Sequence, residues 1–266
     1  MSDGKPGPAV SGGDAVLSVE DLVKTFGGLT AVDGATFDVP GGSVTGLIGP
    51  NGAGKTTLFD VITGIHEPDS GRIRLGDREI QGTSPEEVAR LGVGRTFQTP
   101  RVFRGMSVAE NVAFAATGQT GESAVGALVR GGTVAREEAD LRERVDETLE
   151  FLELDHLADE YARGLSGGQR KLLELGRVLM LDPELIMLDE PVAGVNPALT
   201  DDLLDRLHAL NDEGRTLLLI EHDMDVVMTH CDHVVVVADG RELAAGPPEA
   251  VRTDERVVEA YLGGKR

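Results

Sequence analysis

The stretch Gly49-Pro50-Asn51-Gly52-Ala53-Gly54-Lys55-Thr56-Thr57 decides the fold, because it fits the pattern G-x-x-x-x-G-K-[ST] of a phosphate-binding loop. The apolar run 43–48 before it predicts a short buried strand, and residues 57–62 after it predict the first turns of a helix. Glycines let the backbone wrap closely around a polyphosphate, and the positive end of the following helix points at the same anion. A plain glycine-rich turn also fits the pattern, but the strand before it and the helix after it indicate nucleotide binding.

This loop predicts two specific contacts. We expect the ammonium of Lys55 to reach the β- and γ-phosphates of the nucleotide, and the hydroxyl of Thr56 to ligate Mg²⁺.

Charge and composition exclude several classes of ligand. The 266 residues include 46 acidic and 25 basic side chains, for a net charge of −21. Nucleic acid needs a basic footprint, and anionic lipid attracts basic segments, so neither is expected as a direct ligand. The surface is acidic and poor in lysine, which favours a protein adapted to a salty cytoplasm over an ordinary acidic bacterial protein.

The sequence predicts a cytoplasmic protein that contacts the membrane only through partners. No signal peptide begins the chain, and no apolar run approaches the ~20 residues of a membrane span. Cys231 is the only cysteine, which excludes an internal disulfide. It lies in His230-Cys231-Asp232-His233, and a helix-to-strand corner explains this stretch better than a metal site, because zinc ligands are normally spaced to converge.

The pattern along the chain predicts an α/β fold with a mostly parallel sheet, an N-terminal antiparallel β subdomain and a helical insertion. We expect a disordered tail at 1–14, an ATP-binding core formed by 15–84 and 166–262, and a mainly helical subdomain at 85–165. Residues 15–20 and 36–39 alternate as antiparallel edge strands do, and the glycine-rich stretch 117–132 is expected to be mobile. Phe26 lies between those strands, and its spacing fits a core residue as well as one that stacks on adenine.

A second glycine-rich turn is formed by Leu165-Ser166-Gly167-Gly168-Gln169, directly before a long apolar-striped helix. Ser166, Gly167 and Gly168 would present a further anion-binding helix end. Two glycines directly after a serine are unfavourable in a plain helix start, so they indicate a close approach to the backbone.

Two acids follow a buried strand at Leu188-Asp189-Glu190-Pro191. Burying charge without a partner is costly, and Mg²⁺ is the natural partner for Asp189. Glu190 could then orient or deprotonate an attacking water. His222 ends the next buried strand, where residues of open α/β sheets face the ligand crevice, although a lone histidine is more often structural.

The order of these motifs resembles the ATP-binding subunit of ABC transporters, over roughly residues 15–262. The finer motifs Gly94-Arg95-Thr96-Phe97-Gln98, Glu110-Asn111-Val112, 192–197, 220–224 and 259–263 resemble an ATPase subunit of branched-chain amino acid importers. Close relatives serve urea, other amino acids or lipopolysaccharide export. The exporters have a different sequence around Gln98, which favours the importer.

This resemblance implies a role for each matching residue. Phe26 would stack on adenine, residues 49–57 would hold the triphosphate, and Gln98 would contact Mg²⁺ and the lytic water. Asp189 would support Mg²⁺, Glu190 would be the catalytic base, and His222 would sense the γ-phosphate. Ser166, Gly167 and Gly168 would bind the γ-phosphate of ATP held by the opposing subunit. Residues 195 and 196 depart from the more common Leu-Asp pair, which leaves open how the two active sites communicate.

The resemblance also implies ATP and Mg²⁺ as cofactors. The expected partners are a second, identical or sister, ATPase subunit and separate transmembrane permease subunits. This chain is expected to be peripheral on the inner face of the cell membrane. The alternatives are a non-transport ABC protein that clamps DNA or ribosomes, which the charge disfavours, and a module that binds nucleotide without hydrolysing it.

Overall fold

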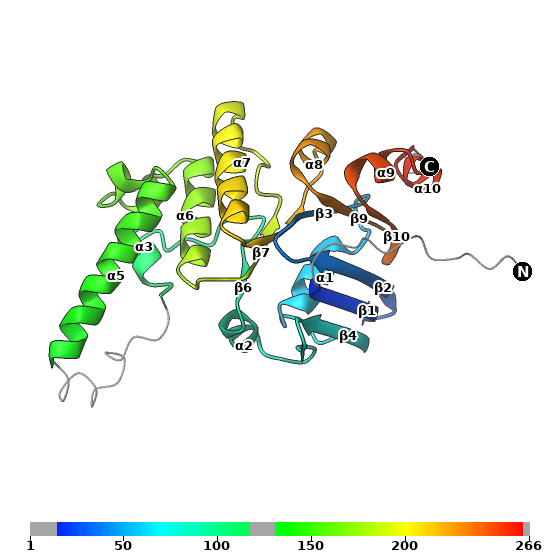
Figure 1. Cartoon of the computed structure of the whole chain (residues 1–266), viewed down its shortest axis with the longest axis horizontal. Helices are drawn as coiled ribbons and strands as arrows, with labels where there is room; N and C mark the ends of the chain where they lie inside the picture. Colours follow the sequence, from blue (N-terminus) through cyan, green and yellow to red (C-terminus); the bar gives the residue numbers. More distant parts are fainter. Residues whose placement is uncertain (1–14, 117–130, 263–266) are drawn as a thin grey trace, which may run out of the picture.

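The computed structural model describes residues 15–116 and 131–262. The predicted tail at 1–14 and most of the predicted mobile stretch 117–132 lie outside the described residues. Figure 1 shows a helical region on one side of a central sheet and a smaller antiparallel sheet below it.

The central sheet has six strands in the order β10-β9-β3-β8-β7-β6. The strands are β3 (Val44–Ile48), β6 (Val93–Arg95), β7 (Leu185–Asp189), β8 (Thr216–Ile220), β9 (His233–Ala238) and β10 (Arg241–Gly246). All neighbours pair in parallel except β10, which forms an antiparallel hairpin with β9. This arrangement brings the carboxyl ends of β3, β6, β7 and β8 to one edge, where a ligand is expected to bind.

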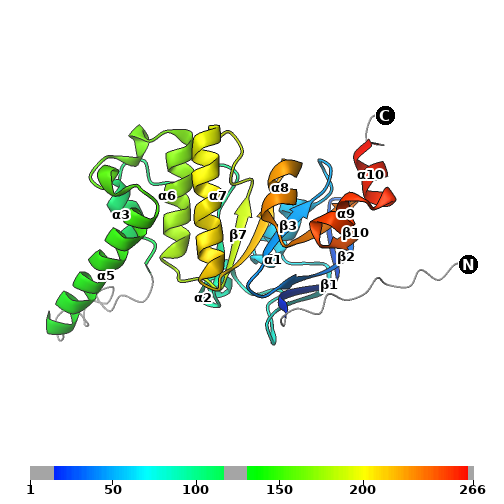
Figure 2. The same cartoon turned by 45° about the horizontal axis from the view of Figure 1, so that its top comes forward.

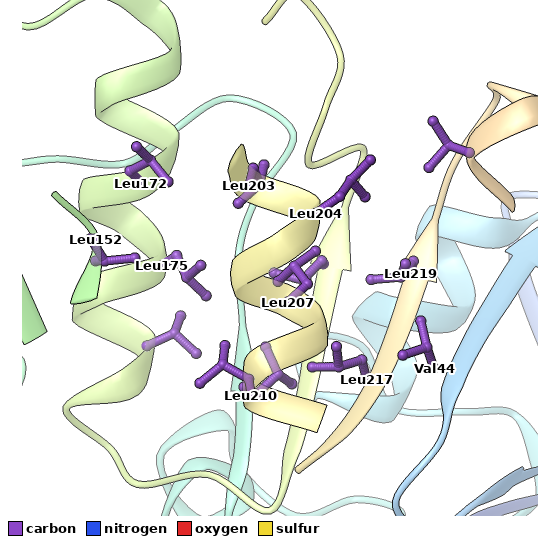
Figure 3. Close-up of a cluster of buried hydrophobic side chains, with 14 of the residues drawn as sticks. Val44, Leu152, Leu172, Leu175, Leu203, Leu204, Leu207, Leu210, Leu217 and Leu219 are labelled. Carbon is purple, nitrogen blue, oxygen red and sulfur yellow. The ribbon is translucent and has the colours of Figure 1, made fainter. Parts of the chain in front are cut away.

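Both faces of this sheet are buried, which explains why its strands are continuous apolar runs. Alternate residues belong to two separate clusters: Leu217 and Leu219 pack toward the long helices, whereas Leu218 packs toward the antiparallel sheet. Figure 3 shows the first cluster, in which leucines of two helices meet Leu217, Leu219 and Val44.

The smaller sheet is antiparallel, in the order β2-β1-β4-β5. Its strands are β1 (Ala15–Phe26), β2 (Leu29–Pro40), β4 (Ser70–Leu75) and β5 (Arg78–Glu79). The two strands predicted at 15–20 and 36–39 are therefore much longer than expected. Asp21 has a left-handed backbone (φ 47°), and the register between β1 and β2 shifts beside it, so the alternating pattern is interrupted while the strand continues.

The helices gather mainly on one side of the central sheet. They are α1 (Lys55–Ile62), α2 (Pro85–Arg90), α3 (Val108–Ala113), α5 (Gly131–Phe151), α6 (Gly167–Leu179), α7 (Pro197–Asp212), α8 (Met224–His230), α9 (Pro248–Arg252) and α10 (Glu255–Leu262). Short 3-10 turns, η2 (Asp155–Leu157) and η3 (Ala162–Gly164), connect α5 to α6. Figures 1 and 2 both show α6 with α3 and α5, separated from α1 by α7 and β7.

The fold class is confirmed, but the boundaries drawn from the sequence do not follow the packing. β6 lies within the predicted helical subdomain, yet it pairs with β7 in the central sheet. α6 lies within the predicted core, yet it packs on α3 and α5. The helical region is therefore formed by residues on both sides of position 165.

The stretch His230-Cys231-Asp232-His233 is the predicted corner, because α8 ends at His230 and β9 begins at His233. Cys231 is buried against Gly46 and Val227. Among residues 15–116 and 131–262, no helix is long and apolar enough to cross a membrane.

Candidate active site

The phosphate loop connects β3 to α1 as predicted, and its glycines are required by the backbone. Gly49, Gly52 and Gly54 all have positive φ angles. A Cβ on Gly49 would lie 2.0 Å from the carbonyl oxygen of Val237, and one on Gly54 would lie 2.3 Å from that of Ala31. Gly54 is the N-cap residue of α1 and has no side chain that could cap its first turn. The N–H groups at this helix end are thus left for an anion.

Lys55 is folded back on this loop. Its ammonium donates to the carbonyl oxygens of Gly49 (2.7 Å) and Pro50 (3.1 Å), and its side chain is buried. Burial lowers the pKa of Lys55, while the charges of Glu190 and Asp189 oppose that shift. The charges of these two acids therefore act on the lysine of the phosphate loop.

Asp189 ends β7 as a buried carboxylate. Burial raises its pKa against the opposing effect of Arg95, whose guanidinium lies 3.6 Å away. Arg95 itself donates to Asp60 of α1 at 2.6 Å and stacks on the rings of Phe59 and Phe97. One guanidinium thus links the strand before Gln98, the helix of the phosphate loop and Asp189.

Glu190 meets the other two predicted catalytic residues. Its Oε2 accepts from Nε2 of Gln98 at 2.9 Å, and its Oε1 lies 2.6 Å from Nε2 of His222. Burial raises the pKa of Glu190, but the bonds from Gln98 and His222 and the charge of Lys171 outweigh burial, so the net pKa is lowered. Glu190 is therefore a carboxylate near neutral pH, as a general base must be.

The oxygen ligands that Mg²⁺ prefers are present at this edge. Thr56 offers an exposed hydroxyl, Asp189 a carboxylate and Gln98 an amide oxygen. Mg²⁺ usually takes only a few protein oxygens and completes its shell with water and phosphate oxygens, so this donor set fits it. In the described part of the chain no three His, Cys, Asp or Glu side chains form a metal cluster of their own.

The second glycine-rich turn forms the start of α6. Ser166 and Gln169 make a reciprocal capping box, in which the Ser166 hydroxyl accepts from the Gln169 N–H (3.2 Å) and Gln169 accepts from the Ser166 N–H (2.9 Å). Gly168 is closely packed, because a Cβ there would lie 2.2 Å from Leu199. Gly167 faces open space. The predicted close approach to the backbone is thus the packing of α7 on Gly168. Ser166 and Gly167 are exposed to solvent.

Phe26 is not a core residue, because it is 41% exposed. Its ring meets His66 edge-on at 5.1 Å, and the ammonium of Lys24 lies 5.3 Å from its centre. Phe26 pairs with Leu29 at the start of β2. In the same strand, the carbonyl oxygen of Ala31 packs against Gly54 of the phosphate loop. An exposed ring near the phosphate loop is able to stack on a base.

Two buried acids and a half-buried lysine that contact the catalytic edge were not predicted from the sequence. Glu221 is 3% exposed and accepts from the N–H groups of Val192 and His222. Glu174 is 4% exposed, and Lys171 donates to the backbone of Glu190. The available signal was a charge within an apolar run: Glu174 interrupts the leucines of α6, and Glu221 follows the buried strand β8.

Comparison with known proteins identifies the class. Residues 32–193 match the family described as "ABC transporter", so the chain belongs to the ABC transporter family of ATP-binding proteins, which hydrolyse ATP to drive transport. Residues 241–266 match the family described as "Branched-chain amino acid ATP-binding cassette transporter".

The similar proteins of known name include branched-chain amino acid transport ATP-binding proteins. The chain is 43% identical over 249 residues to the high-affinity branched-chain amino acid transport ATP-binding protein BraF of Pseudomonas aeruginosa, covering 93% of this chain and 98% of the relative. It is 40% identical over 250 residues to the probable branched-chain amino acid transport ATP-binding protein LivG of Archaeoglobus fulgidus, covering 94% and 96%. A crystal structure of an ATP-binding cassette in its ADP conformation matches with a TM-score of 0.79 at 40% identity, covering 94% of this chain and 99% of that one.

Proposed function

We propose that this chain is the ATPase subunit of an importer for branched-chain amino acids, working on the inner face of the cell membrane through separate permease subunits. The observation that carries the chemistry is Glu190, held as a carboxylate between Gln98 and His222. The proposed solute rests on the branched-chain relatives and on the match of residues 241–266.

ATP would be bound by the phosphate loop, with its base on the exposed ring of Phe26. Lys55 would exchange its bonds to the carbonyls of Gly49 and Pro50 for the β- and γ-phosphates. Glu190 would take a proton from the attacking water, while His222 and Gln98 fix the orientation of its carboxylate. Mg²⁺, held by Thr56, Asp189 and Gln98, would supply positive charge to the phosphate oxygens.

The active site is completed by a second ATPase subunit. Ser166 and Gly167 lie at an exposed helix end, and α6 is separated from α1 by α7 and β7 (Figures 1 and 2). We therefore assign the Ser166 turn to ATP held by the opposing subunit, in a dimer that closes head to tail.

The permease contact is proposed on an aromatic surface of the helical region. Phe103 and Phe114 meet edge-on at 4.8 Å and are 39% and 60% exposed. The guanidinium of Arg177 lies 4.8 Å from the Phe103 ring, on a chain whose net charge is −21. Aromatic rings and arginine are enriched where proteins meet. Phe103 is five residues from Gln98, so a partner on this surface would lie close to the catalytic edge.

Amino acid uptake in the source cells tests the function. Deleting the gene should abolish high-affinity uptake of labelled leucine, isoleucine and valine, and the wild-type chain should restore it. The Glu190→Gln chain should bind ATP but restore nothing, because it lacks the base. Normal leucine uptake in the deletion strain, with loss of urea uptake instead, would overturn the assigned solute.

A further inference from the structure

The first turns of α6 direct two charged side chains at the catalytic edge of the same subunit. The Lys171 ammonium donates to the backbone carbonyl oxygen of Glu190 at 2.5 Å. One turn further, the carboxylate of Glu174 accepts from the N–H of Phe97 at 3.2 Å and of Arg101 at 2.9 Å. These two N–H groups lie on either side of Gln98. α6 therefore holds the backbone of Glu190 and, on either side of Gln98, the loop whose Gln98 donates to the Glu190 carboxylate.

Glu190 has a backbone that needs external support. Its φ angle is 51°, in the left-handed region that side chains other than glycine seldom adopt. Its N–H donates to Ile220 at 2.9 Å, and its carbonyl oxygen accepts from Ala193 at 3.2 Å as well as from Lys171. Such conformations persist when the surroundings fix them, and they are common at active sites. Lys171 is the side chain that fixes this carbonyl.

Lys171 also places a positive charge among four acids, of which Glu221, Glu174 and Asp189 are buried. The charged groups around its ammonium are Glu221, Glu190, Glu174 and Asp189. A cavity of about 20 Å³, enough for about one water molecule, lies between Lys171, Glu174 and Asp189. Leu175, Leu188 and Leu203 also line this cavity, so the charged groups of α6 and β7 lie beside an apolar contact.

We propose that Lys171 is a positioning residue for ATP hydrolysis, which holds Glu190 in its catalytic orientation without touching the nucleotide. This inference rests on the proposed role of Glu190 as the base. Because α6 also begins with Ser166, the helix that completes the partner's site is tied through Lys171 to the base of its own site.

Three substitutions test this inference in the full-length chain. Lys171→Arg keeps both charge and donor, Lys171→Gln keeps a donor without charge, and Lys171→Met removes both. A misplaced catalytic group costs up to about a hundredfold in rate, so kcat should fall about tenfold to a hundredfold in the Met variant and less in the Gln variant. The Arg variant should stay within about threefold of wild type. The affinity for a fluorescent ATP analogue should be unchanged, because Lys171 does not contact the nucleotide.

Two further variants distinguish a wrong role for Lys171 from a wrong role for Glu190. Arg142→Met removes a basic residue of α5 that pairs with exposed Glu138, and it should leave kcat unchanged. Glu190→Gln should abolish turnover; if it does not, the proposed base itself is wrong. If Glu190→Gln is inactive but Lys171→Met keeps its kcat, only the role of Lys171 is overturned. If the Met variant does not fold, loss of kcat in the Gln variant with rescue in the Arg variant decides for the proposal, and equal kcat in both decides against it.

Discussion

Glu190 shows how neighbouring groups prepare a single carboxylate. Burial alone raises its pKa, and the donors Gln98 and His222 reverse that effect. The sequence could place Glu190 and His222 together, because each follows a buried strand and such ends meet at one edge, whereas Gln98 was predicted only from the family resemblance. It could not predict Lys171 at the Glu190 carbonyl, because that contact depends on how α6 packs, which no local pattern encodes.

Cys231 gives a prediction for the pH dependence of stability. Burial, with the charges of Asp232 and Glu221, raises its pKa from an ordinary value near 9 to about 12. Between these values the folded chain keeps a proton that the unfolded chain loses. The contribution of Cys231 to the free energy of unfolding is therefore fully present below about pH 9 and is lost as the pH rises toward 12.

Urea unfolding of wild type and Cys231→Ala at about pH 8 and pH 10 measures this effect. The advantage of wild type should shrink by up to about 1.4 kcal/mol per pH unit above 9. An advantage that stays constant across this range would show that the thiol does not titrate differently in the folded chain.

Among the elements, α3 is held to the loop before it by one buried side chain. Asn111 is 0% exposed; its amide nitrogen donates to the carbonyls of Phe103 (3.0 Å) and Ser107 (2.8 Å), and its oxygen accepts from the Phe103 N–H (2.8 Å). Asn111→Leu leaves the Phe103 N–H without a partner, while the carbonyls of Phe103 and Ser107 keep their backbone donors, the N–H groups of Met106 and Asn111. Burying the unpaired N–H costs about 1–3 kcal/mol.

Urea unfolding is the measurement for this variant. Asn211→Ala is the matched control, because Asn211 is half-buried and its amide makes one hydrogen bond, to the Arg215 carbonyl. Equal stabilities of the two variants would contradict the assigned role of Asn111.

Elements buried on both faces were the most predictable, and elements with irregular backbone the least. β7 and β8 each carry four consecutive apolar residues, and both were predicted as buried strands. β1 continues past the left-handed Asp21, where its alternation is lost, so the sequence indicated only its first half. The Ser166 turn was predicted as a helix start, but its reciprocal cap with Gln169 was not, although a serine followed three residues later by a glutamine is the pattern of a capping box.

For the whole molecule, the net charge of −21 predicts that salt stabilises the fold. Self-repulsion of exposed acids destabilises a compact chain, and salt screens it over a Debye length of about 10 Å at 0.1 M. The thermal midpoint should rise between about 0.1 M and 2 M KCl. A variant with the exposed Glu143, Glu147 and Glu150 of α5 changed to Gln should rise less. A midpoint independent of KCl would count against salt adaptation.

The two proposed half-sites, the phosphate loop before α1 and the Ser166 turn before α6, lie on different sides of α7 and β7 (Figure 2), as a site shared between two subunits requires. The most direct measurement is the ATPase rate of Lys55→Ala and Ser166→Arg variants, assayed separately and as a 1:1 mixture. Each variant alone should be inactive, and the mixture should regain activity, because a mixed dimer contains one site with an intact phosphate loop and an intact Ser166 turn. Wild-type turnover by the Ser166→Arg variant alone, or an inactive mixture, would contradict a site shared between two subunits.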